Sequence, residues 1–421
     1  MKYGLIGEKL GHSWSCEIHA LIPADYDYEL KELQPDEVGA FVSSRDFRAF
    51  NVTIPYKKTV IPFLDRLSEE ALLTGSVNTV VNRDGVLYGY NTDVYGLTAQ
   101  LTRGDNAIRG KVAFVLGTGG VSKSAAEAAR RAGAKSVTFV SREKKEGAVT
   151  YEALLTRAGD VEYLINCTPV GMYPRCGVSP VTVADYPNLC GVTDLIYNPL
   201  RSELVRQARE KGVPAEGGLH MLCAQAVKAA SLFFDRGFPP ELAGEICEKL
   251  TKEKENIVLI GLPASGKTTV GRLLAERLGR AFIDTDDEIV AKAGKSIPEI
   301  FAQEGEAVFR QIEADVIREV GAKTGAVIAT GGGAVLRPEN VTALKQNGKL
   351  FFLDRAPEKL IPGTGRPLFA DPRQAFQLYA RREPLYRAAA DVTVDANGTI
   401  EETAGKIAEA PPVADEARRF W

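Results

Sequence analysis

The chain has 421 residues, of which 45% are hydrophobic and 25% charged, and its formal net charge is −3. This composition is that of an ordinary folded protein with room for two or three domains, and it argues against an intrinsically disordered chain. The weak acidity argues against nucleic acid or an anionic membrane as a partner, and no apolar run approaches the ~20 residues of a membrane span.

The six cysteines show no C-x-x-C spacing and the chain has only three histidines, so the sequence offers little for a zinc site. The first residues pass directly into a short strand and a glycine turn, unlike a secretory signal peptide. We therefore expect a protein of the reducing cytoplasm. The sequence leaves the oligomeric state open.

The first strand is expected at residues 2–6, before a loop that carries Ser13 and Ser15. Serines at this place are equally suited to capping a helix, here at residues 17–21, and both interpretations stay open. Further on, Thr53 and Lys57 follow a strand end. On its own, Lys57 is also consistent with a solvated surface lysine.

A hairpin is predicted next, with strands at 79–82 and 86–90 and an Asp-Gly turn between them. Asn78 precedes the first strand and Asp93 follows the second. Together, the strand-end loops present hydroxyl, amide, ammonium and carboxylate groups, a set that suits a polyhydroxylated small molecule. Lys57 and Asp93 are the charged pair among them that can carry acid–base chemistry.

A buried strand at 112–116, a glycine-rich turn and an alanine-rich helix at 122–132 form the usual setting of a dinucleotide site. The next strand, 136–140, ends in Ser141 and Arg142, with two lysines behind them. An acid at this place binds the ribose 2′-hydroxyl of NAD, whereas basic residues favour a 2′-phosphate. NADP(H) is the prediction, and Glu143 is the counter-argument.

Three later stretches carry further polar groups. A strand at 163–166 leads into Cys167 and Thr168, and we expect the cysteine to be packed rather than reactive. Tyr197 follows an apolar run, and Gln225 lies on a helix that runs on to residue 234. By default Gln225 is a surface or buried amide.

Residues 1 to about 250 resemble shikimate dehydrogenases along their whole length. The motifs that carry the resemblance are Gly11-His12-Ser13-x-Ser15, Asn51-Val52-Thr53-x-Pro55-x-Lys57, Val77-Asn78-Thr79, Gly89-x-Asn91-Thr92-Asp93, Gly117-x-Gly119-Gly120, Asn166-x-Thr168-Pro169-x-Gly171-Met172 and Met221-Leu222-x-x-Gln225-Ala226. Several motifs in the same order make a chance match negligible.

The resemblance implies roles for individual residues. It assigns proton transfer at the C3 oxygen of shikimate to Lys57 and Asp93. It implies that shikimate contacts Ser13, Ser15, Thr53, Asn78, Tyr197 and Gln225. It implies that NADP contacts Gly117, Gly119, Gly120, Val121, Ser141, Arg142, Thr168 and Gly218. Cys16 stands where the family often has proline, and quinate dehydrogenases share much of the pattern, so quinate stays open as a substrate.

A second glycine-rich motif begins at Gly261, after an apolar run at 257–260. It reads Gly261-Leu-Pro-Ala264-Ser265-Gly266-Lys267-Thr268-Thr269 and matches the P-loop pattern. Backbone N–H groups of such a loop surround a phosphate, the lysine reaches the outer phosphates, and the threonine hydroxyl binds Mg²⁺. The P-loop helix is expected at 269–278.

Two acids, Asp284 and Asp286, follow the next strand, 280–283. One can hold the hydration shell of Mg²⁺ while the other accepts a proton from a substrate hydroxyl, although one of them can equally cap a helix at 288–293. Arg310 and Glu313 have the spacing of a surface ion pair on a helix. The triplet Gly331-Gly332-Gly333 follows a strand at 326–329 and suggests close approach of a ligand.

Residues 256 to about 408 resemble shikimate kinases. Besides the P-loop, the resemblance depends on Asp284-x-Asp286, Phe309-Arg310-x-x-Glu313, the glycine triplet, Arg366-Pro367-Leu368 and Arg382-x-Pro384-Leu385-Tyr386. It implies that ATP contacts Gly261, Ala264, Ser265, Gly266, Lys267, Thr268 and Thr269, and that Mg²⁺ is held by Thr268 and Asp284. It implies that shikimate contacts Asp286, Arg310, Gly331, Gly332, Gly333 and Arg382. Lys267, Asp286 and Arg366 are the implied catalytic residues, Arg366 in a compact mobile lid.

The predicted architecture is α/β throughout, in two halves. We expect an α/β substrate-binding domain at 1–100, with helices about 220–250 packing back on it, and a Rossmann NADP-binding domain at 101–219. A charged linker at 251–255, a P-loop kinase domain with a parallel sheet at 256–410 and a tail at 411–421 follow. The hypothesis is a bifunctional enzyme that reduces 3-dehydroshikimate with NADPH and phosphorylates shikimate with ATP–Mg²⁺; a half that only binds ligand, without catalysis, is the alternative.

Overall fold

The structure is a computed structural model that describes residues 1–11, 13–360 and 372–410. Arg366, its lid and the 411–421 tail lie outside the described residues. The chain divides into two compact units, one of 1–172, 178–197 and 202–250, the other of 173–177, 198–201 and 251–421. In the part of the chain that is described, no helix is long and apolar enough to cross a membrane.

The first sheet of unit 1 has the strand order β2-β1-β3-β5-β6-β4. Its strands are β1 (Tyr3–Gly7), β2 (Tyr28–Glu32), β3 (Ala49–Val52), β4 (Arg66–Leu67), β5 (Thr79–Arg83) and β6 (Val86–Tyr90), and α1 (Ser15–Ala20), α2 (Glu37–Ser44) and α3 (Glu69–Thr74) lie between them in the chain. β5 and β6 pair antiparallel around Asp84 and Gly85, both of which have positive φ, as a tight hairpin turn requires. The predicted hairpin is confirmed.

The second sheet of unit 1 is parallel, in the order β12-β11-β10-β7-β8-β9. Its strands are β7 (Val112–Leu116), β8 (Ser136–Ser141), β9 (Ala148–Thr150), β10 (Tyr163–Asn166), β11 (Gly191–Asp194) and β12 (Ala215–Glu216), connected through α5 (Ser122–Arg131), α6 (Tyr151–Thr156) and α7 (Glu203–Glu210) among other segments. This is the predicted Rossmann arrangement, with the glycine turn between β7 and α5.

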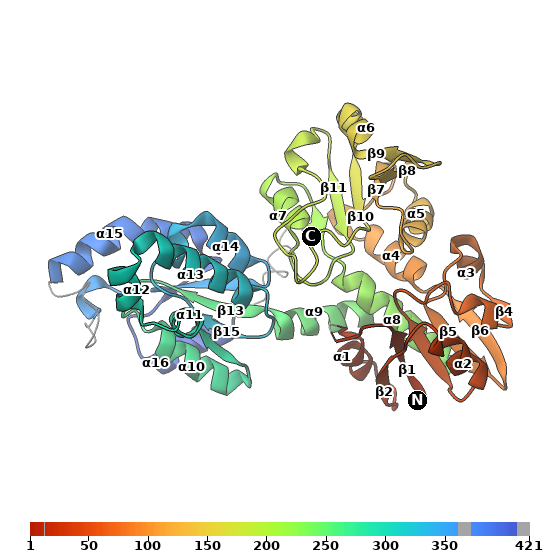
Figure 1. Ribbon diagram of the computed structural model, residues 1–421, viewed down its shortest axis with the longest axis horizontal. Helices are drawn as coiled ribbons and strands as arrows, with labels where there is room; N and C mark the ends of the chain where they lie inside the picture. Colours follow the sequence, from red (N-terminus) through yellow and green to blue (C-terminus); the bar gives the residue numbers. More distant parts are fainter. Residues whose placement is uncertain (12, 361–371, 411–421) are drawn as a thin grey trace. The chain divides into compact units, whose positions relative to one another are not determined.

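Two helices, α4 (Asp93–Leu101) and α8 (Leu219–Phe234), pack closely on each other where the two sheets of unit 1 meet (Figure 1). A Cβ added at Gly96 of α4 would lie 2.6 Å from the Met221 carbonyl oxygen of α8, so the close crossing requires a glycine there. Val94, Leu97 and Met221 share one buried core with the second sheet. Helix α4 is thereby fixed against α8 and the second sheet.

Unit 2 contains a parallel sheet in the order β14-β15-β13-β16-β17. Its strands are β13 (Asn256–Ile260), β14 (Phe282–Asp284), β15 (Val327–Ala329), β16 (Gly348–Asp354) and β17 (Val392–Asp395). Its helices are α10 (Lys267–Leu278), α11 (Thr285–Ala293), α12 (Ile297–Gln303), α13 (Glu306–Gly321), α14 (Pro338–Lys345), α15 (Pro372–Ala389) and α16 (Ile400–Ala408). Apolar side chains cover both faces of this sheet in two separate clusters, as parallel sheets require. The α/β fold class predicted for both halves is confirmed.

The predicted linker 251–255 is helical over most of its length, because α9 (Leu242–Lys254) continues through it. The run contains lysine and glutamate, which are good helix formers, and no glycine or proline that would end a helix. The boundary between the two units falls inside α9, between Leu250 and Thr251.

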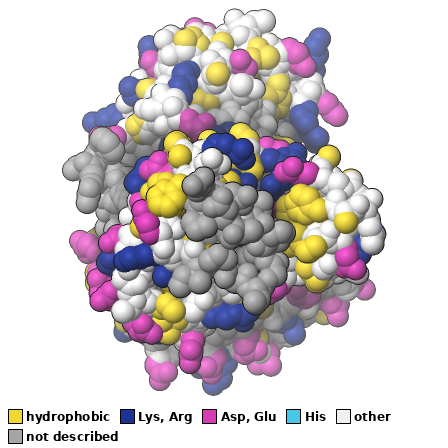
Figure 2. Space-filling model, turned by 90° about the vertical axis from the view of Figure 1, so that its left-hand side faces the viewer, with side chains coloured by type: hydrophobic (Ala, Val, Ile, Leu, Met, Phe, Trp, Pro, Cys, Tyr) yellow, Lys and Arg dark blue, Asp and Glu magenta, His cyan; other side chains and the backbone are white. Residues whose placement is uncertain are grey.

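Figure 2 faces unit 2, on which the described basic and acidic side chains are intermixed rather than separated by sign.

Candidate active sites

In unit 1, the predicted acid–base pair forms a buried ion pair. The Lys57 Nζ lies 2.6 Å from the Asp93 Oδ2, and the two side chains are 18% and 6% exposed. Lys57 follows β3 and Asp93 is the first residue of α4, so the pair joins the sheet to the helix that crosses α8. A freely solvated lysine is thereby ruled out. The pair can exchange a proton with a ligand hydroxyl placed beside it.

Asn78 fixes the orientation of the Asp93 carboxylate. The Asn78 Nδ2 donates to the Asp93 Oδ1 at 2.8 Å, which leaves the other carboxylate oxygen to Lys57. The Asn78 Oδ1 accepts from the backbone N–H of Thr92 at 2.8 Å, so its amide cannot flip without losing both bonds. Gln225 of α8 reaches this group, because its Oε1 lies 3.3 Å from the Thr92 hydroxyl. Lys57, Asn78, Asp93 and Gln225, which come from four separate stretches of the sequence, therefore lie close together.

The serine loop lies against Tyr197 through the ring of Trp14. The Ser13 hydroxyl donates to the Ser15 hydroxyl at 3.0 Å, and neither caps α1, whose N-cap residue is Trp14 without a side-chain cap. The ring of Trp14 packs edge-on against Tyr197 at 5.1 Å between centroids. Thr53, after β3, donates its backbone N–H to the carbonyl oxygen of Ile6 at the end of β1.

A polar layer below Asn78 was missed by the sequence analysis. The Tyr28 hydroxyl donates to the Asn51 Oδ1 at 2.7 Å, and the Asn51 Nδ2 donates to the Asn78 carbonyl oxygen at 3.2 Å. The His19 ring stacks on Tyr28 at 3.7 Å between centroids. Burial lowers the pKa of His19 to about 3, against the opposing effect of a hydrogen bond to Asn51, so the ring is neutral. The signal available was the position of His19, one helical turn after Ser15.

The glycine turn between β7 and α5 has the open backbone that a dinucleotide needs. A Cβ added at Gly119 or Gly120 would meet nothing within 4 Å, and Gly117 has a φ of +101°. At Gly117 an added Cβ would lie 3.1 Å from the Thr168 side chain, so the two predicted cofactor loops touch. The Lys145 amine donates to the Thr118 hydroxyl at 3.3 Å, which places a basic side chain at the turn.

The other residues predicted to bind NADP lie at the end of β8 and at the starts of α5 and α8. Ser141 ends β8, and Arg142 after it is exposed. Val121 is the N-cap residue of α5, and Gly218 is the N-cap residue of α8. A Cβ at Gly218 would collide with the Leu195 backbone, which explains the glycine without a ligand. Cys167 is packed in the core of the second sheet, and burial raises the pKa of its thiol, as expected for an unreactive cysteine.

In unit 2, the P-loop joins β13 to α10. Gly261 and Gly266 have φ values of +146° and +98°, and Ala264 has +64°. The Lys267 Nζ donates to the carbonyl oxygens of Gly261 and Leu262 at 2.9 and 2.8 Å. The Ser265 hydroxyl is buried and has no hydrogen-bond partner among the described residues. An unpaired buried hydroxyl inside a P-loop fits a loop shaped for a phosphate.

Of the two predicted acids, Asp284 contacts both the P-loop and the start of a helix. The Asp284 Oδ2 accepts from the Thr268 hydroxyl at 2.8 Å, while its Oδ1 accepts from the Asp286 backbone N–H at 3.0 Å and caps α11. Asp284 is therefore the acid that caps the helix, and it also contacts Thr268 of the P-loop. No cluster of three or more His, Cys, Asp or Glu side chains suited to a metal exists in the described parts of the chain.

The glycine triplet is explained by side chains that approach its backbone. An added Cβ would lie 2.7 Å from the Asp286 Oδ1 at Gly331 and 2.7 Å from Pro263 at Gly332, and at Gly333 it would collide with the Arg310 guanidinium. Protein side chains thus approach this backbone closely, and the predicted contact with a ligand stays a prediction. The triplet therefore brings Asp286 and Arg310 together.

The two predicted arginines flank the triplet. The Arg382 Nη1 donates to the Gly332 carbonyl oxygen at 3.0 Å, and its Nε is buried without a partner among the described residues. Arg310 pairs with Glu313 at 2.8 Å, and since their side chains are only 18% and 1% exposed, this is not a surface ion pair. Burial raises the pKa of Glu313, against the opposing hydrogen bond from Arg310. Arg310 and Arg382 therefore offer two guanidinium groups to a ligand, and Asp286 offers a carboxylate.

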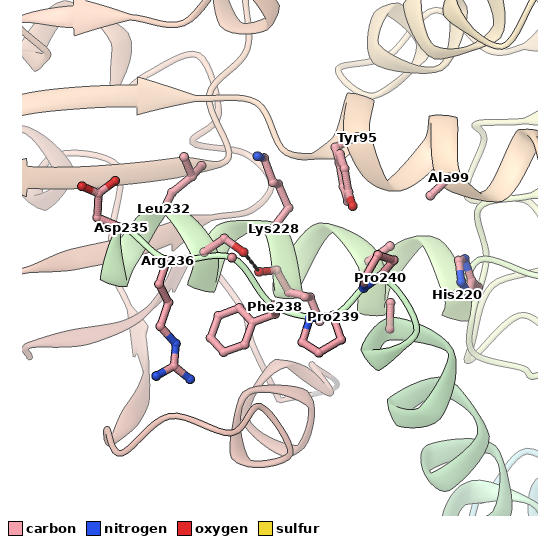
Figure 3. Close-up of a pocket in the computed structure, with 15 residues that line it drawn as sticks. Tyr95, Ala99, His220, Lys228, Leu232, Asp235, Arg236, Phe238, Pro239 and Pro240 are labelled. Carbon is pink, nitrogen blue, oxygen red and sulfur yellow. Dashed lines mark hydrogen bonds between the residues drawn. The ribbon is translucent and has the colours of Figure 1, made fainter.

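Two cavities are lined at least in part by residues to which the sequence assigned no role. One of about 200 Å³ borders Ala264, Ser265, Gly266 and Thr269 of the P-loop and is also lined by Arg355 and Lys359, which the sequence analysis missed. The other, of about 430 Å³, lies on unit 1 along α4 and α8 and contains none of the described site residues (Figure 3). Its cations are already engaged, since Lys228 lies over the Tyr95 ring and Arg236 over Phe238.

Comparison with known proteins identifies both halves. A family model for the shikimate dehydrogenase substrate-binding domain matches residues 5–80, and one for shikimate kinase matches residues 263–411. A curated relative named shikimate dehydrogenase (NADP(+)), from Clostridium beijerinckii, is 38% identical over 247 residues, which cover 55% of this chain and 91% of the relative.

Solved structures agree with this identification. A chorismate mutase/shikimate 5-dehydrogenase fusion protein from Clostridium acetobutylicum is similar with a TM-score of 0.56 and 36% identity, over 59% of this chain and 96% of the other. A shikimate 5-dehydrogenase from Thermus thermophilus, solved with NADP(H) and shikimate, has a TM-score of 0.54 and 29% identity over 59% and 99% of the two chains. The chain belongs to the shikimate dehydrogenase family and carries a shikimate kinase domain after its dehydrogenase part.

Proposed function

We propose that the chain catalyses two consecutive reactions, the NADPH-dependent reduction of 3-dehydroshikimate to shikimate and the ATP-dependent phosphorylation of shikimate to shikimate 3-phosphate. The observation that carries the proposal is the presence of two separately built sites. One is the buried Lys57–Asp93 pair held by Asn78, and the other is the P-loop with Asp284, beside the glycine triplet.

In the dehydrogenase site, Lys57 donates a proton to the C3 oxygen during reduction, and Asp93 keeps the ammonium group in place. NADPH supplies the hydride. Asn78 and Gln225 bind the ring hydroxyls from one side, because the Asn78 amide contacts Asp93 and also lies 3.4 Å from the Gln225 Oε1. Ser13, Ser15, Thr53 and Tyr197 complete the substrate site. The serine pair offers two hydroxyls within 3.0 Å of each other, which suits a carboxylate as acceptor.

The cofactor is held by the turn between β7 and α5 and by the residues after β8. Gly119, Gly120 and Val121 offer backbone N–H groups to the pyrophosphate, which the open space at Gly119 and Gly120 allows. Gly117, whose own N–H donates to the Val140 carbonyl oxygen, borders the cofactor and shapes the turn. Ser141 and Arg142 bind the 2′-phosphate of NADPH, since a guanidinium pairs well with a phosphate. Thr168 and Gly218 border the cofactor on the other side.

In the kinase site, the P-loop residues bind the ATP phosphates. Lys267 leaves its two backbone carbonyl partners for the outer phosphates, and Ser265 gains a partner for its bare hydroxyl. Thr268 and Asp284 hold Mg²⁺, which neutralises phosphate charge. The cavity with Arg355 and Lys359 borders the P-loop and receives the remainder of the nucleotide.

Shikimate binds in the kinase site between the two arginines and Asp286. Arg310 and Arg382 bind its carboxylate, because a planar guanidinium can donate two parallel hydrogen bonds to it. Asp286 accepts the proton of the attacking hydroxyl. Gly331, Gly332 and Gly333 leave room for these side chains beside the sheet. Arg366 belongs to the proposed catalytic set by resemblance.

The test separates the two sites within one polypeptide. Lys57→Ala should abolish NADP-linked oxidation of shikimate and leave its phosphorylation intact, and Lys267→Ala should do the reverse. Lys58→Ala is the matched control, since this neighbouring lysine is exposed and outside both sites. Loss of both activities in either single variant would contradict two independent sites.

A further inference from the structure

Two buried polar residues at the ends of neighbouring strands have no role in the mechanism above. Asn166 ends β10 and Asp194 ends β11, and the two occupy the same register position of the parallel sheet. Both are 0% exposed. Burying a polar side chain costs free energy of folding unless the side chain is hydrogen-bonded. The hydrogen-bond partners of these two residues therefore indicate what the residues are for.

The Asp194 carboxylate accepts three hydrogen bonds. Its Oδ1 accepts from the Asn166 Nδ2 at 2.9 Å and from the Ile196 backbone N–H at 3.1 Å, and its Oδ2 accepts from the Ser202 hydroxyl at 2.5 Å. The bond to Ile196 spans two residues and fixes the turn by which the chain leaves β11. Tyr197, the next residue, is thereby directed toward Trp14 and the serine loop.

Asn166 makes the corresponding turn on its own strand. Its Oδ1 accepts from both the backbone N–H and the hydroxyl of Thr168, at 3.0 and 2.7 Å. This turn places the Thr168 side chain beside Gly117, since a Cβ added at Gly117 would lie 3.1 Å from it. The Asn166–Asp194 hydrogen bond thus joins a turn that leads to the cofactor loop with a turn that leads to the substrate tyrosine.

The geometry points to Asp194 as a positioning residue that, through Asn166, couples cofactor binding at Thr168 to substrate binding at Tyr197. The inference rests on the proposed dehydrogenase function and on the roles given there to Thr168 and Tyr197. NADP that holds the Thr168 turn also holds the Tyr197 turn, so each ligand binds more tightly when the other is present.

The hydrogen-bond pattern, rather than the charge of Asp194, carries this role. All three donors to the carboxylate are neutral. Burial raises the pKa of Asp194 to about 6, in agreement with a site that does not favour the anion. Asparagine at this position keeps one oxygen for Asn166 and Ile196 and donates its NH₂ to the Ser202 hydroxyl, so Asp194→Asn preserves the junction.

Two variants in the full chain separate coupling from a purely structural role. Asn166→Asp places two carboxylates against each other and should weaken both NADP⁺ and shikimate binding by about tenfold, the loss expected for a broken buried hydrogen bond. Asp194→Asn should stay within about threefold of the unmodified protein.

Calorimetry gives the Kd of each ligand with and without the other. The thermal midpoint of each variant is measured as well, and shikimate kinase activity serves as an internal control. The inference predicts that the ratio of shikimate Kd without and with NADP⁺ falls toward one in Asn166→Asp and is kept in Asp194→Asn. A purely structural role predicts a lower thermal midpoint with that ratio unchanged, which would overturn the inference, as would loss in Asp194→Asn or in one ligand only. Failure of the proposed function is recognised separately, as absence of NADP-linked turnover in the unmodified protein.

Discussion

Replacing Asp93 by asparagine tests the Lys57–Asp93 pair most sharply, because it keeps the side-chain size and removes the charge. In the structure one carboxylate oxygen faces Lys57 at 2.6 Å and the other faces the Asn78 amide at 2.8 Å. Asparagine has a single oxygen, so it can serve only one of the two partners. If its oxygen stays with Asn78, its NH₂ points at the Lys57 ammonium group, and a charge-assisted hydrogen bond is lost whichever way the amide turns.

The magnitude follows from the burial of the pair. Hydrogen bonds to charged groups are worth about 1.5–3 kcal/mol, and breaking a buried ion pair costs about 3–5 kcal/mol. With the lysine side chain 18% exposed, we expect a loss of about 3 kcal/mol, which lowers the thermal midpoint of unit 1 by about 6–12 °C. The kcat for shikimate oxidation should fall by about 10²- to 10⁴-fold, the range for a misplaced general acid–base group.

The assay is steady-state oxidation of shikimate followed by NADPH absorbance, with kinase activity measured on the same sample. Asp105→Asn serves as the control, because Asp105 is an exposed acid of the same unit. The reasoning is refuted if Asp93→Asn retains kcat within threefold of the control. It is refuted equally if the kinase activity falls in parallel, since that outcome indicates general misfolding.

Three further predictions concern other parts of the molecule. Ser265→Ala should raise the KM for ATP with an unchanged thermal midpoint, because the buried hydroxyl has no partner to lose among the described residues; an unchanged KM in kinase assays would contradict this. Gly333→Ala should push away the Arg310 guanidinium and raise the kinase KM for shikimate but not for ATP, whereas equal rises in both KM values would speak against it. Because burial raises the pKa of Asp194 from 3.8 to about 6, the folded chain binds more protons than the unfolded chain between these values. The free energy of unfolding should therefore decrease as pH rises through that window, and denaturant titrations of Asp194→Asn should lack this slope.

Local signals in the sequence were sufficient for most of the fold. Strands such as β7 and β10 have the predicted bounds, because continuous apolar runs between turn residues leave little choice. The Asp84-Gly85 turn alone defined the hairpin of β5 and β6. The helical continuation of α9 through the charged run at 251–254 was not predicted, since charge alone does not distinguish a linker from a solvated helix.

The candidate site was predictable where motifs carry it and not where distant side chains meet. Lys57 and Asp93 could be chosen as a pair by chemistry, whereas the contact of Tyr28 with Asn51 leaves no periodic trace in the sequence. The same is true of the Asn166–Asp194 bond, because it depends on strand register between segments 28 residues apart. The sequence identified the glycine triplet as a place of close approach, but only the folded unit shows which side chains require the glycines.

The central claim, two successive activities in one chain, is tested most directly by coupled turnover of the pure protein. Given 3-dehydroshikimate, NADPH and ATP–Mg²⁺, it should oxidise NADPH and then form ADP and shikimate 3-phosphate. Lys267→Ala should stop at shikimate, while Lys57→Ala should form neither product from 3-dehydroshikimate yet still phosphorylate added shikimate. NADPH oxidation without any shikimate 3-phosphate in the unmodified protein would contradict the account.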